Sequence, residues 1–156
     1  PSVVAIRLGE VLRIVVASPA LVAGREGLDQ PGRLADLPWV ALAPYYRHEV
    51  RLRRGHGEEY GLAIQPRIVT DSLYALRSAV LQGVGAAIAS AWVVRDDLAS
   101  GALVQLVPDW QAPAIPVHLL YPYARFYPAK LRRFVDVMRD SMGNSQDFFN
   151  DEPLNR

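Results

Sequence analysis

The order of hydrophobic and polar positions along the chain predicts short strands alternating with short helices. Residues 3–8 and 11–17 are apolar and rich in β-branched side chains, and the Gly-Glu pair between them predicts two separate strands. The second segment is almost continuously apolar, which is typical of a strand buried on both faces. Ser18 followed by Pro19 then favours the start of a helix of about two turns.

The middle of the chain continues this alternation. One helical turn is predicted at residues 33–37, and an apolar strand at residues 39–42. Two further strands, residues 49–54 and 62–69, flank the glycine-containing segment 55–61, which predicts a hairpin with that segment as its connection. The alternation as a whole predicts an α/β fold.

The clearest internal helix begins near Leu73. Its apolar positions recur at helical spacing, each of the three residues before it is a capable N-cap, and Gly83 stands where a C-terminal glycine belongs. The remaining elements are predicted as a strand, a helix, two strands and a final amphipathic helix, at residues 86–89, 90–98, 103–107, 115–121 and 128–142. Beyond residue 143 the chain turns polar and acidic, which predicts a frayed tail.

Length and composition exclude several classes of protein. With 156 residues, 51% of them hydrophobic and 21% charged, the chain is one compact domain or part of a larger one. Its net charge of +1 gives no electrostatic basis for binding nucleic acid or an anionic membrane. No apolar run reaches the roughly 20 residues that span a bilayer. The absence of cysteine excludes disulfides and thiolate sites and fits a reducing cytoplasm.

No catalytic, cofactor or metal motif emerges from the residues. Gly83 and Gly85 resemble the first two glycines of a dinucleotide fingerprint, but Ile88 replaces the third. A helix-ending glycine followed by a close backbone approach is the better interpretation. The three histidines have no metal-ligand spacing, and no serine lies in a nucleophile turn. Asp96 and Asp97 are adjacent, which indicates a solvated helix face rather than an acid/base pair.

A cluster of basic residues falls on the predicted strand 49–54 and just before it. Glu49 interrupts the cluster, which favours a charged strand near a sheet edge that discourages self-pairing. Contact with nucleic acid is the weaker alternative. The members of the cluster are Arg47, Arg51, Arg53 and Arg54.

The helix start at Thr70, Asp71 and Ser72 carries the strongest indication of a binding site. Backbone N–H groups and the positive end of the helix dipole favour small anions there, and the two hydroxyls add donors. The alternative is that the three residues only cap the helix. Asp71 would repel a carboxylate if it faced the same cleft.

Four segments, taken in order, resemble the C-terminal regulatory domain of LysR-type transcriptional regulators. Their order, spacing and extent carry the resemblance, which covers residues 3–142. The segments are IRLGEVLRIVVASPALVA (6–23), GRLADLPWV (32–40), VTDSLYALRSAVLQGVGAAIASAWVVRDDLASGALVQLVPDW (69–110) and YPAKLRRFVDVM (127–138).

This resemblance implies an α/β fold of the periplasmic-binding-protein-like type II class, in which two lobes are joined by two crossover strands. The end of lobe one and the first crossover would occupy residues 1–17, and lobe two would occupy residues 18–108. The second crossover and the return to lobe one would occupy residues 109–143, followed by the tail at residues 144–156. The start of lobe one and the winged helix-turn-helix that binds DNA are expected to precede Pro1.

The resemblance also implies a site. Thr70, Asp71 and Ser72 would face the cleft between the lobes, with Ser18 and Pro19 as weaker candidates. The expected ligand is a small-molecule effector, and the helix start favours an anionic one. By bridging the lobes it would change their closure and, through a homodimer or homotetramer, move the distant DNA-binding helices.

The expected protein is a cytoplasmic regulator with no catalytic residue, no cofactor, no metal and no membrane contact. It is expected to contact DNA only through the missing N-terminal domain. A periplasmic solute-binding protein of similar fold is the alternative, because fold alone does not separate the two. An enzyme that uses the cleft is the third interpretation, and no nucleophile, metal or cofactor motif supports it.

Overall fold

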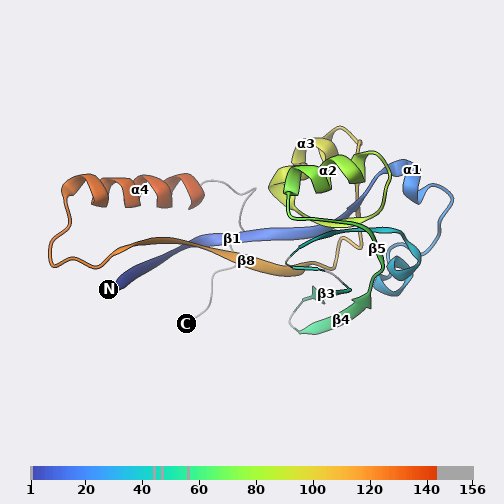
Figure 1. Cartoon of the computed structure of the whole chain (residues 1–156), viewed down its shortest axis with the longest axis horizontal. Coiled ribbons are helices and arrows are strands. Elements are labelled where there is room, and N and C mark those ends of the chain that lie inside the picture. Colours follow the sequence, from blue (N-terminus) through green and yellow to red (C-terminus); the bar gives the residue numbers. More distant parts are fainter. Residues whose placement is uncertain (1, 44, 47, 56, 144–156) are drawn as a thin grey trace. The chain divides into compact units, whose positions relative to one another are not determined.

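Contacts within the chain divide it into two compact units (Figure 1). Unit 1 consists of Pro1–Leu12 together with Ala114–Arg156, and unit 2 is the continuous segment Arg13–Pro113. The predicted alternation of strands and helices is confirmed. The tail predicted beyond residue 143 lies outside the described residues. This computed structural model describes residues 2–43, 45–46, 48–55 and 57–143.

One long strand, β1 (Val3–Ala17), runs from unit 1 into unit 2. The prediction of two strands broken at Gly9 and Glu10 was wrong. The backbone stays extended through both residues, because Gly9 does not adopt a positive φ and Glu10 pairs with Arg7 on the same strand. One glycine without a second turn-forming residue is too weak a signal to end a strand.

The second half of β1 lies at the centre of the sheet in unit 2. β6 (Ala87–Ser90) pairs with it on one side and β7 (Val104–Leu106) on the other, both antiparallel. Ile14 to Ala17 are almost completely buried, which confirms the prediction of a strand covered on both faces.

A parallel pair of strands extends this sheet. β2 (Trp39–Leu42) pairs with β5 (Pro66–Thr70), and a parallel bridge between Trp39 and Ala86 joins the pair to the chain that leads into β6. All four residues of β2 are buried. The Trp39 ring lies in the core, and its indole N–H donates to the carbonyl oxygen of Leu34 at 2.9 Å.

Two helices cover one side of these strands, as Figure 1 shows. α2 (Leu73–Leu81) packs on β2 and β6, and α3 (Ala91–Ala99) packs beside α2. Gly83 has a φ of +72°, so it ends α2 in the left-handed conformation that the sequence predicts. Two short helices complete the unit, α1 (Pro19–Val22) and the 3-10 helix η1 (Pro31–Asp36).

The predicted hairpin is present, but its second strand begins and ends earlier than the predicted 62–69. Residues 66–69 belong instead to β5, which pairs with β2. β3 (Glu49–Arg54) pairs with β4 (Glu58–Ala63), so the predicted connection 55–61 was too long. Glu58 and Glu59 lie opposite the arginines Arg54 and Arg53 and pair with them, so both belong to the second strand. The arginines of β3 are therefore charge-compensated, and those paired with a glutamate are Arg51, Arg53 and Arg54.

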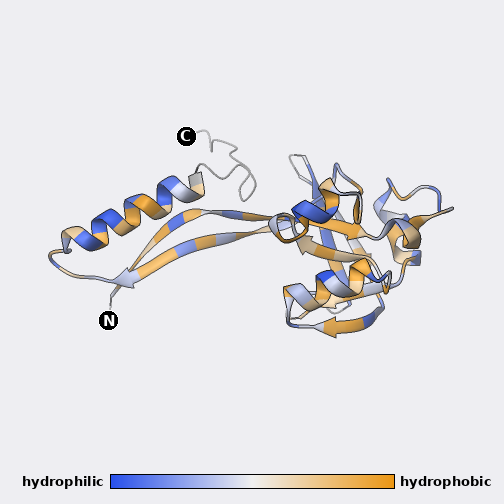
Figure 2. Ribbon diagram, turned by 90° about the horizontal axis from the view of Figure 1, so that it is seen from above, coloured by the Kyte–Doolittle hydropathy of each residue, from blue (hydrophilic) through white to orange (hydrophobic). Residues whose placement is uncertain are grey.

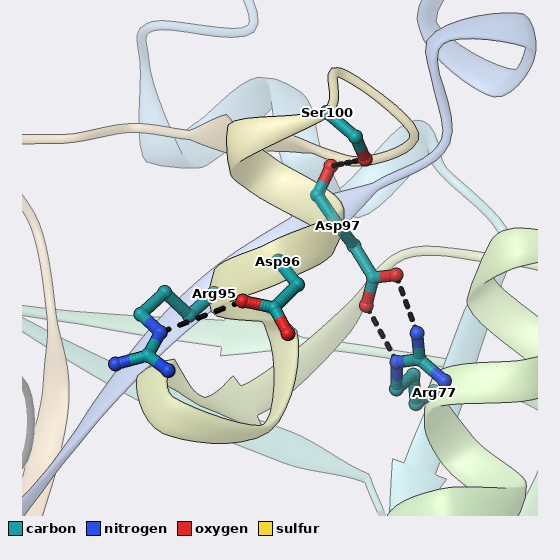
Figure 3. A network of polar contacts seen from close by, with 5 residues as sticks. All are labelled: Arg77, Arg95, Asp96, Asp97 and Ser100. Atoms are coloured by element: carbon teal, nitrogen blue, oxygen red, sulfur yellow. Dashed lines mark hydrogen bonds and ion pairs between the residues drawn. The ribbon is translucent and has the colours of Figure 1, made fainter.

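The expectation that Asp96 and Asp97 share a solvated helix face was wrong for one of them. Asp96 is exposed, whereas Asp97 is buried and accepts hydrogen bonds from two guanidinium nitrogens of Arg77 at 2.5 Å each (Figure 3). This hydrogen bonding raises the pKa of Arg77. The pair ties α3 to α2, and a planar guanidinium suits this two-point contact.

Unit 1 contains the first part of β1, the strand β8 (Ala112–Pro122) over most of its length, and α4 (Ala129–Gly143). β8 pairs with β1, and the amide of Tyr123 donates to the carbonyl of Ser2 at 2.8 Å. The predicted amphipathic character of the last helix is confirmed, as the alternating colours along α4 in Figure 2 show. Among the described residues, no helix is long and apolar enough to cross a bilayer.

Gly85 allows β2 and the start of β6 to meet. A Cβ atom at this position would lie 2.7 Å from the carbonyl oxygen of Pro38 and 2.8 Å from the carbonyl carbon of Trp39. The interpretation of Gly85 as a close-approach residue is therefore confirmed.

We expect Gly85→Ala to lower the free energy of unfolding by about 1 to 3 kcal/mol, because the backbone atoms it would meet cannot move without breaking the bridge. Urea denaturation measures the change. Gly61→Ala is the control, since its Cβ would make only an ordinary contact, 3.6 Å from Glu49. Equal stability for the two variants would contradict the explanation.

We expect Arg77→Met to lower the melting temperature more than Asp97→Asn does. The first variant leaves a buried carboxylate without its partner, whereas the second leaves a partly exposed guanidinium that water can solvate. Thermal unfolding of both variants tests this, and a larger loss for Asp97→Asn would contradict it.

Candidate functional site

The strands of unit 2 bring several polar residues to one edge of the sheet. β2, β5 and β6 run in the same direction, and β1 runs against them. The C-terminal ends of the three strands therefore meet at the edge where β1 enters unit 2. Thr70 ends β5 there, and Arg13 lies opposite Ser90 at the end of β6. In open α/β sheets this carboxyl edge is where ligands bind, and we call it the carboxyl edge.

The predicted site residues before α2 lie at the carboxyl edge and also act as caps. The Ser72 hydroxyl accepts from the amide of Ala75 at 3.3 Å, and the Thr70 hydroxyl accepts from the amide of Ser72 at 3.2 Å. Asp71 is exposed between them. A capping role is confirmed for Ser72, and the positive end of the helix dipole faces the same edge.

Ser18 and Pro19 lie at the opposite edge of the sheet. They follow the C-terminal end of β1, and the Ser18 hydroxyl lies near Gly83, 3.4 Å from where a Cβ of that glycine would be. Gly83 follows the last turn of α2, whereas Thr70 and Ser72 precede its first. The structure therefore does not bring the two predicted groups together.

A pocket at the carboxyl edge contains residues that the sequence analysis missed. It has a volume of about 310 Å³ and lies entirely within unit 2. Arg13 forms its buried end, and two tyrosines from the loop after β2 pack on the guanidinium, with ring centroids 5.3 and 5.2 Å from Cζ. The lining residues are Arg13, Tyr45, Tyr46, Glu49, Arg51 and Pro113.

The guanidinium of Arg13, the first residue of unit 2, contacts Pro113, the last. Its Nε donates to the carbonyl oxygen of Pro113 at 2.8 Å, and its Nη2 donates to the same oxygen. Burial lowers the pKa of Arg13, an effect that the two nearby tyrosines partly oppose. The group nevertheless stays charged at neutral pH, because an arginine begins from so high a value.

Tyr46 lies deeper in the pocket than Tyr45. Tyr46 is 7% exposed and Tyr45 52% exposed. Burial raises the pKa of Tyr46 to about 12, against the opposing effect of the Arg13 charge. Its hydroxyl therefore remains protonated, and able to donate a hydrogen bond, throughout the neutral range.

One signal in the sequence could have identified this pocket. Arg13 is the only charged residue in the apolar segment 11–17, which was correctly predicted to be buried on both faces. A buried cation needs hydrogen-bond acceptors or a counter-ion. The partners Tyr46 and Pro113 are 33 and 100 positions away, so no local pattern reveals them.

The arrangement at the carboxyl edge is suited to binding. A buried guanidinium, a phenol hydroxyl and a helix N-terminus can bind an anionic group. The aromatic faces can pack against an apolar body attached to it. Within the described residues, no group of three His, Asp or Glu side chains could hold a metal ion.

The fold is that of a regulatory domain of the periplasmic-binding-protein-like type II class. The chain belongs to the LysR substrate binding domain family, which it matches over residues 1–143. The fold class and family expected from the sequence are thus confirmed.

Known regulators resemble the chain over most of its length. The HTH-type transcriptional regulator PtxR of Pseudomonas aeruginosa is 27% identical over 137 residues, which cover 88% of this chain and 44% of PtxR. The full-length structure of AphB, a virulence activator of Vibrio cholerae, superposes with a TM-score of 0.77 at 26% identity, covering 90% of this chain and 48% of AphB. The regulatory domain of CrgA from Neisseria meningitidis shares the fold, with a TM-score of 0.71 at 24% identity, covering 90% and 69%. The chain spans about half the length of the curated relatives it matches.

We expect Ser72→Ala to lower the free energy of unfolding by about 1 kcal/mol, because it removes the hydroxyl that accepts from the Ala75 amide. Ser90→Ala is a matched control, since Ser90 precedes α3 without a side-chain cap hydrogen bond. Chemical denaturation of both variants measures the difference. A cost for Ser90→Ala as large as that for Ser72→Ala would contradict the capping role.

Proposed function

We propose that this chain is the effector-sensing part of a LysR-type transcriptional regulator. The observation that carries the proposal is the family match over residues 1–143, together with curated relatives that are named as transcriptional regulators. The polar carboxyl edge supports it, because a sensing domain needs a place where a small molecule can bind.

In this proposal unit 2 is the second lobe of the regulatory domain. β1 and β8 are the two crossover strands, since each passes from one unit into the other. Unit 1 is the C-terminal part of the first lobe. Thr70, Asp71 and Ser72 line the cleft that receives the effector, with the positive end of the α2 dipole favouring an anion.

The proposed mechanism is a shift between populations. The effector binds the closed arrangement of the lobes more tightly than the open one. The ratio of the two affinities determines how far the equilibrium shifts toward the closed arrangement. Closure repacks a homodimer or homotetramer and moves an N-terminal winged helix-turn-helix outside this chain, through which the cytoplasmic protein contacts DNA.

The proposal assigns the chain no catalytic reaction and no membrane contact. A regulator and a periplasmic solute-binding protein can share this fold. They differ in that the regulator also has a DNA-binding domain, and effector binding changes its affinity for DNA. The relatives named above support the regulator.

The product of the whole gene, including the coding sequence upstream of Pro1, tests this function. It is expected to bind a DNA site, and at least one small metabolite should change its affinity by about 5- to 150-fold, the usual range of allosteric coupling. Electrophoretic mobility shifts across a metabolite panel measure this. An upstream secretory leader with no DNA binding would overturn the proposal in favour of the solute-binding protein.

Asp71→Asn tests whether the α2 start faces the effector. Removing this exposed negative charge should strengthen the binding of an anionic effector several-fold, because charge repulsion at the edge falls. Asp96→Asn removes an exposed charge on α3 and should leave the affinity unchanged. Equal effects of both variants would remove Thr70–Ser72 from the site.

A further inference from the structure

The pocket beside Arg13 contains two hydrogen-bond donors that the described residues leave unused. Nη1 of Arg13 and the hydroxyl of Tyr46 are both closed off from solvent, and neither has a partner in the described part of the chain. Arg13 itself is 8% exposed. Burying a donor without an acceptor destabilises a protein, so two such groups on neighbouring side chains indicate that an acceptor is supplied from outside.

The pocket also carries one uncompensated positive charge. The carboxylate of Glu49 lies 3.0 Å from Nε of Arg51, so these two lining residues neutralise each other. No described carboxylate pairs with Arg13, whose charge is met only by the Pro113 carbonyl and the two tyrosine rings. A single buried cation without a carboxylate matches a ligand with one negative charge.

The volume of the pocket and the residues that line it limit the ligands that can fit. A volume of about 310 Å³ lies at the small end of ligand pockets. The rings of Tyr45 and Tyr46 present flat apolar surfaces, and Pro113 adds an aliphatic one. Tyr45 is the more exposed of the two rings over Arg13, and exposed side chains change rotamer quickly. Because the Tyr45 ring packs over the Arg13 guanidinium, we infer that a rotamer change of Tyr45 admits the ligand.

We propose that this pocket binds a small monocarboxylate with a flat apolar body, whose oxygens accept from Nη1 of Arg13 and the hydroxyl of Tyr46. Arg13 is the first residue of unit 2, and it holds the carbonyl of Pro113, the last. The ligand thus binds where the chain enters and leaves this unit. Arg13 lies three strand spacings from Thr70, about 14 Å along the carboxyl edge, and the two tyrosines follow β2, the strand next to β5.

The proposal rests on the sensing role proposed above and gives it a ligand class. Sodium benzoate is the probe, and benzamide is its neutral counterpart of the same shape. In an NMR titration of the ¹⁵N-labelled chain at constant ionic strength, benzoate should shift the Arg13 Nε–H signal saturably. Benzamide should bind at least tenfold more weakly, because it lacks the charge. Absence of saturation, or equal binding of the two compounds, would overturn the proposal.

Tyr46→Phe is the most informative variant. It keeps the ring and removes only a hydroxyl without an internal partner, so the melting temperature should stay the same or rise. The dissociation constant for benzoate should increase about tenfold, as expected for the loss of a hydrogen bond to a charged acceptor. Tyr45→Phe removes the neighbouring hydroxyl and should change the dissociation constant less than twofold. A Tyr46→Phe variant that melts lower and binds benzoate normally would overturn the proposal.

The two proposals fail in different ways. If benzoate binding is saturable and depends on Tyr46, but the product of the whole gene does not bind DNA, the pocket proposal is supported and the regulator proposal is overturned. If DNA binding responds to other metabolites, but the chain does not bind benzoate saturably, the pocket proposal is overturned and the regulator proposal is supported.

Discussion

Two backbone hydrogen bonds between β2 and Ala86 determine the architecture of unit 2. The amide of Val40 donates to the carbonyl of Ala86, and the amide of Ala86 donates to the carbonyl of Pro38, both at 2.8 Å. They form only because Gly85 has no side chain to separate the two backbones. Through them the parallel β2–β5 pair joins the antiparallel strands around β1, and the C-terminal ends of β2, β5 and β6 come to one edge.

The two edges of this sheet have different chemistry as a consequence. The carboxyl edge gathers the α2 N-terminus, the loop that carries Tyr45 and Tyr46, and the charged end of β1 at Arg13. The opposite edge carries Ser18 and the glycine that ends α2. Buried polar atoms without a partner among the described residues occur at both edges: Nη1 of Arg13 and the Tyr46 hydroxyl at the carboxyl edge, and the Ser18 hydroxyl at the opposite one. At the carboxyl edge a positive charge and a pocket accompany them.

The sequence predicted most of the elements, because their signals are local. The start of α2 at Ser72, its end at Gly83 and the close approach at Gly85 all follow from short patterns, and the structure confirms each. The break predicted in β1 was wrong because the strand pairs with β8, a distant segment that no local pattern reveals. The burial of Asp97 was missed because its partner Arg77 belongs to a different helix.

The site was harder to predict, because it depends on which strand ends meet. Thr70–Ser72 were selected from a helix-start pattern, and the structure places them at the carboxyl edge; their role in binding stays a prediction. Ser18 also looks like a helix start, but the direction of β1 places it at the far edge. Arg13 contacts Pro113 across 100 positions, and a separation of that size is visible only after folding.

The number of strands that pair with β1 changes along its length. From Arg13 onward the strand is hydrogen-bonded to β6 and then to β7 as well, so it is part of a sheet. Before Arg13 its partner is β8, which carries prolines at positions 113, 116 and 122 that cannot donate to a ladder. A two-stranded ribbon twists more readily than a wider sheet. At Arg13 the strand therefore passes from a two-stranded ribbon into a wider sheet, and the guanidinium that holds the Pro113 carbonyl stands at this junction.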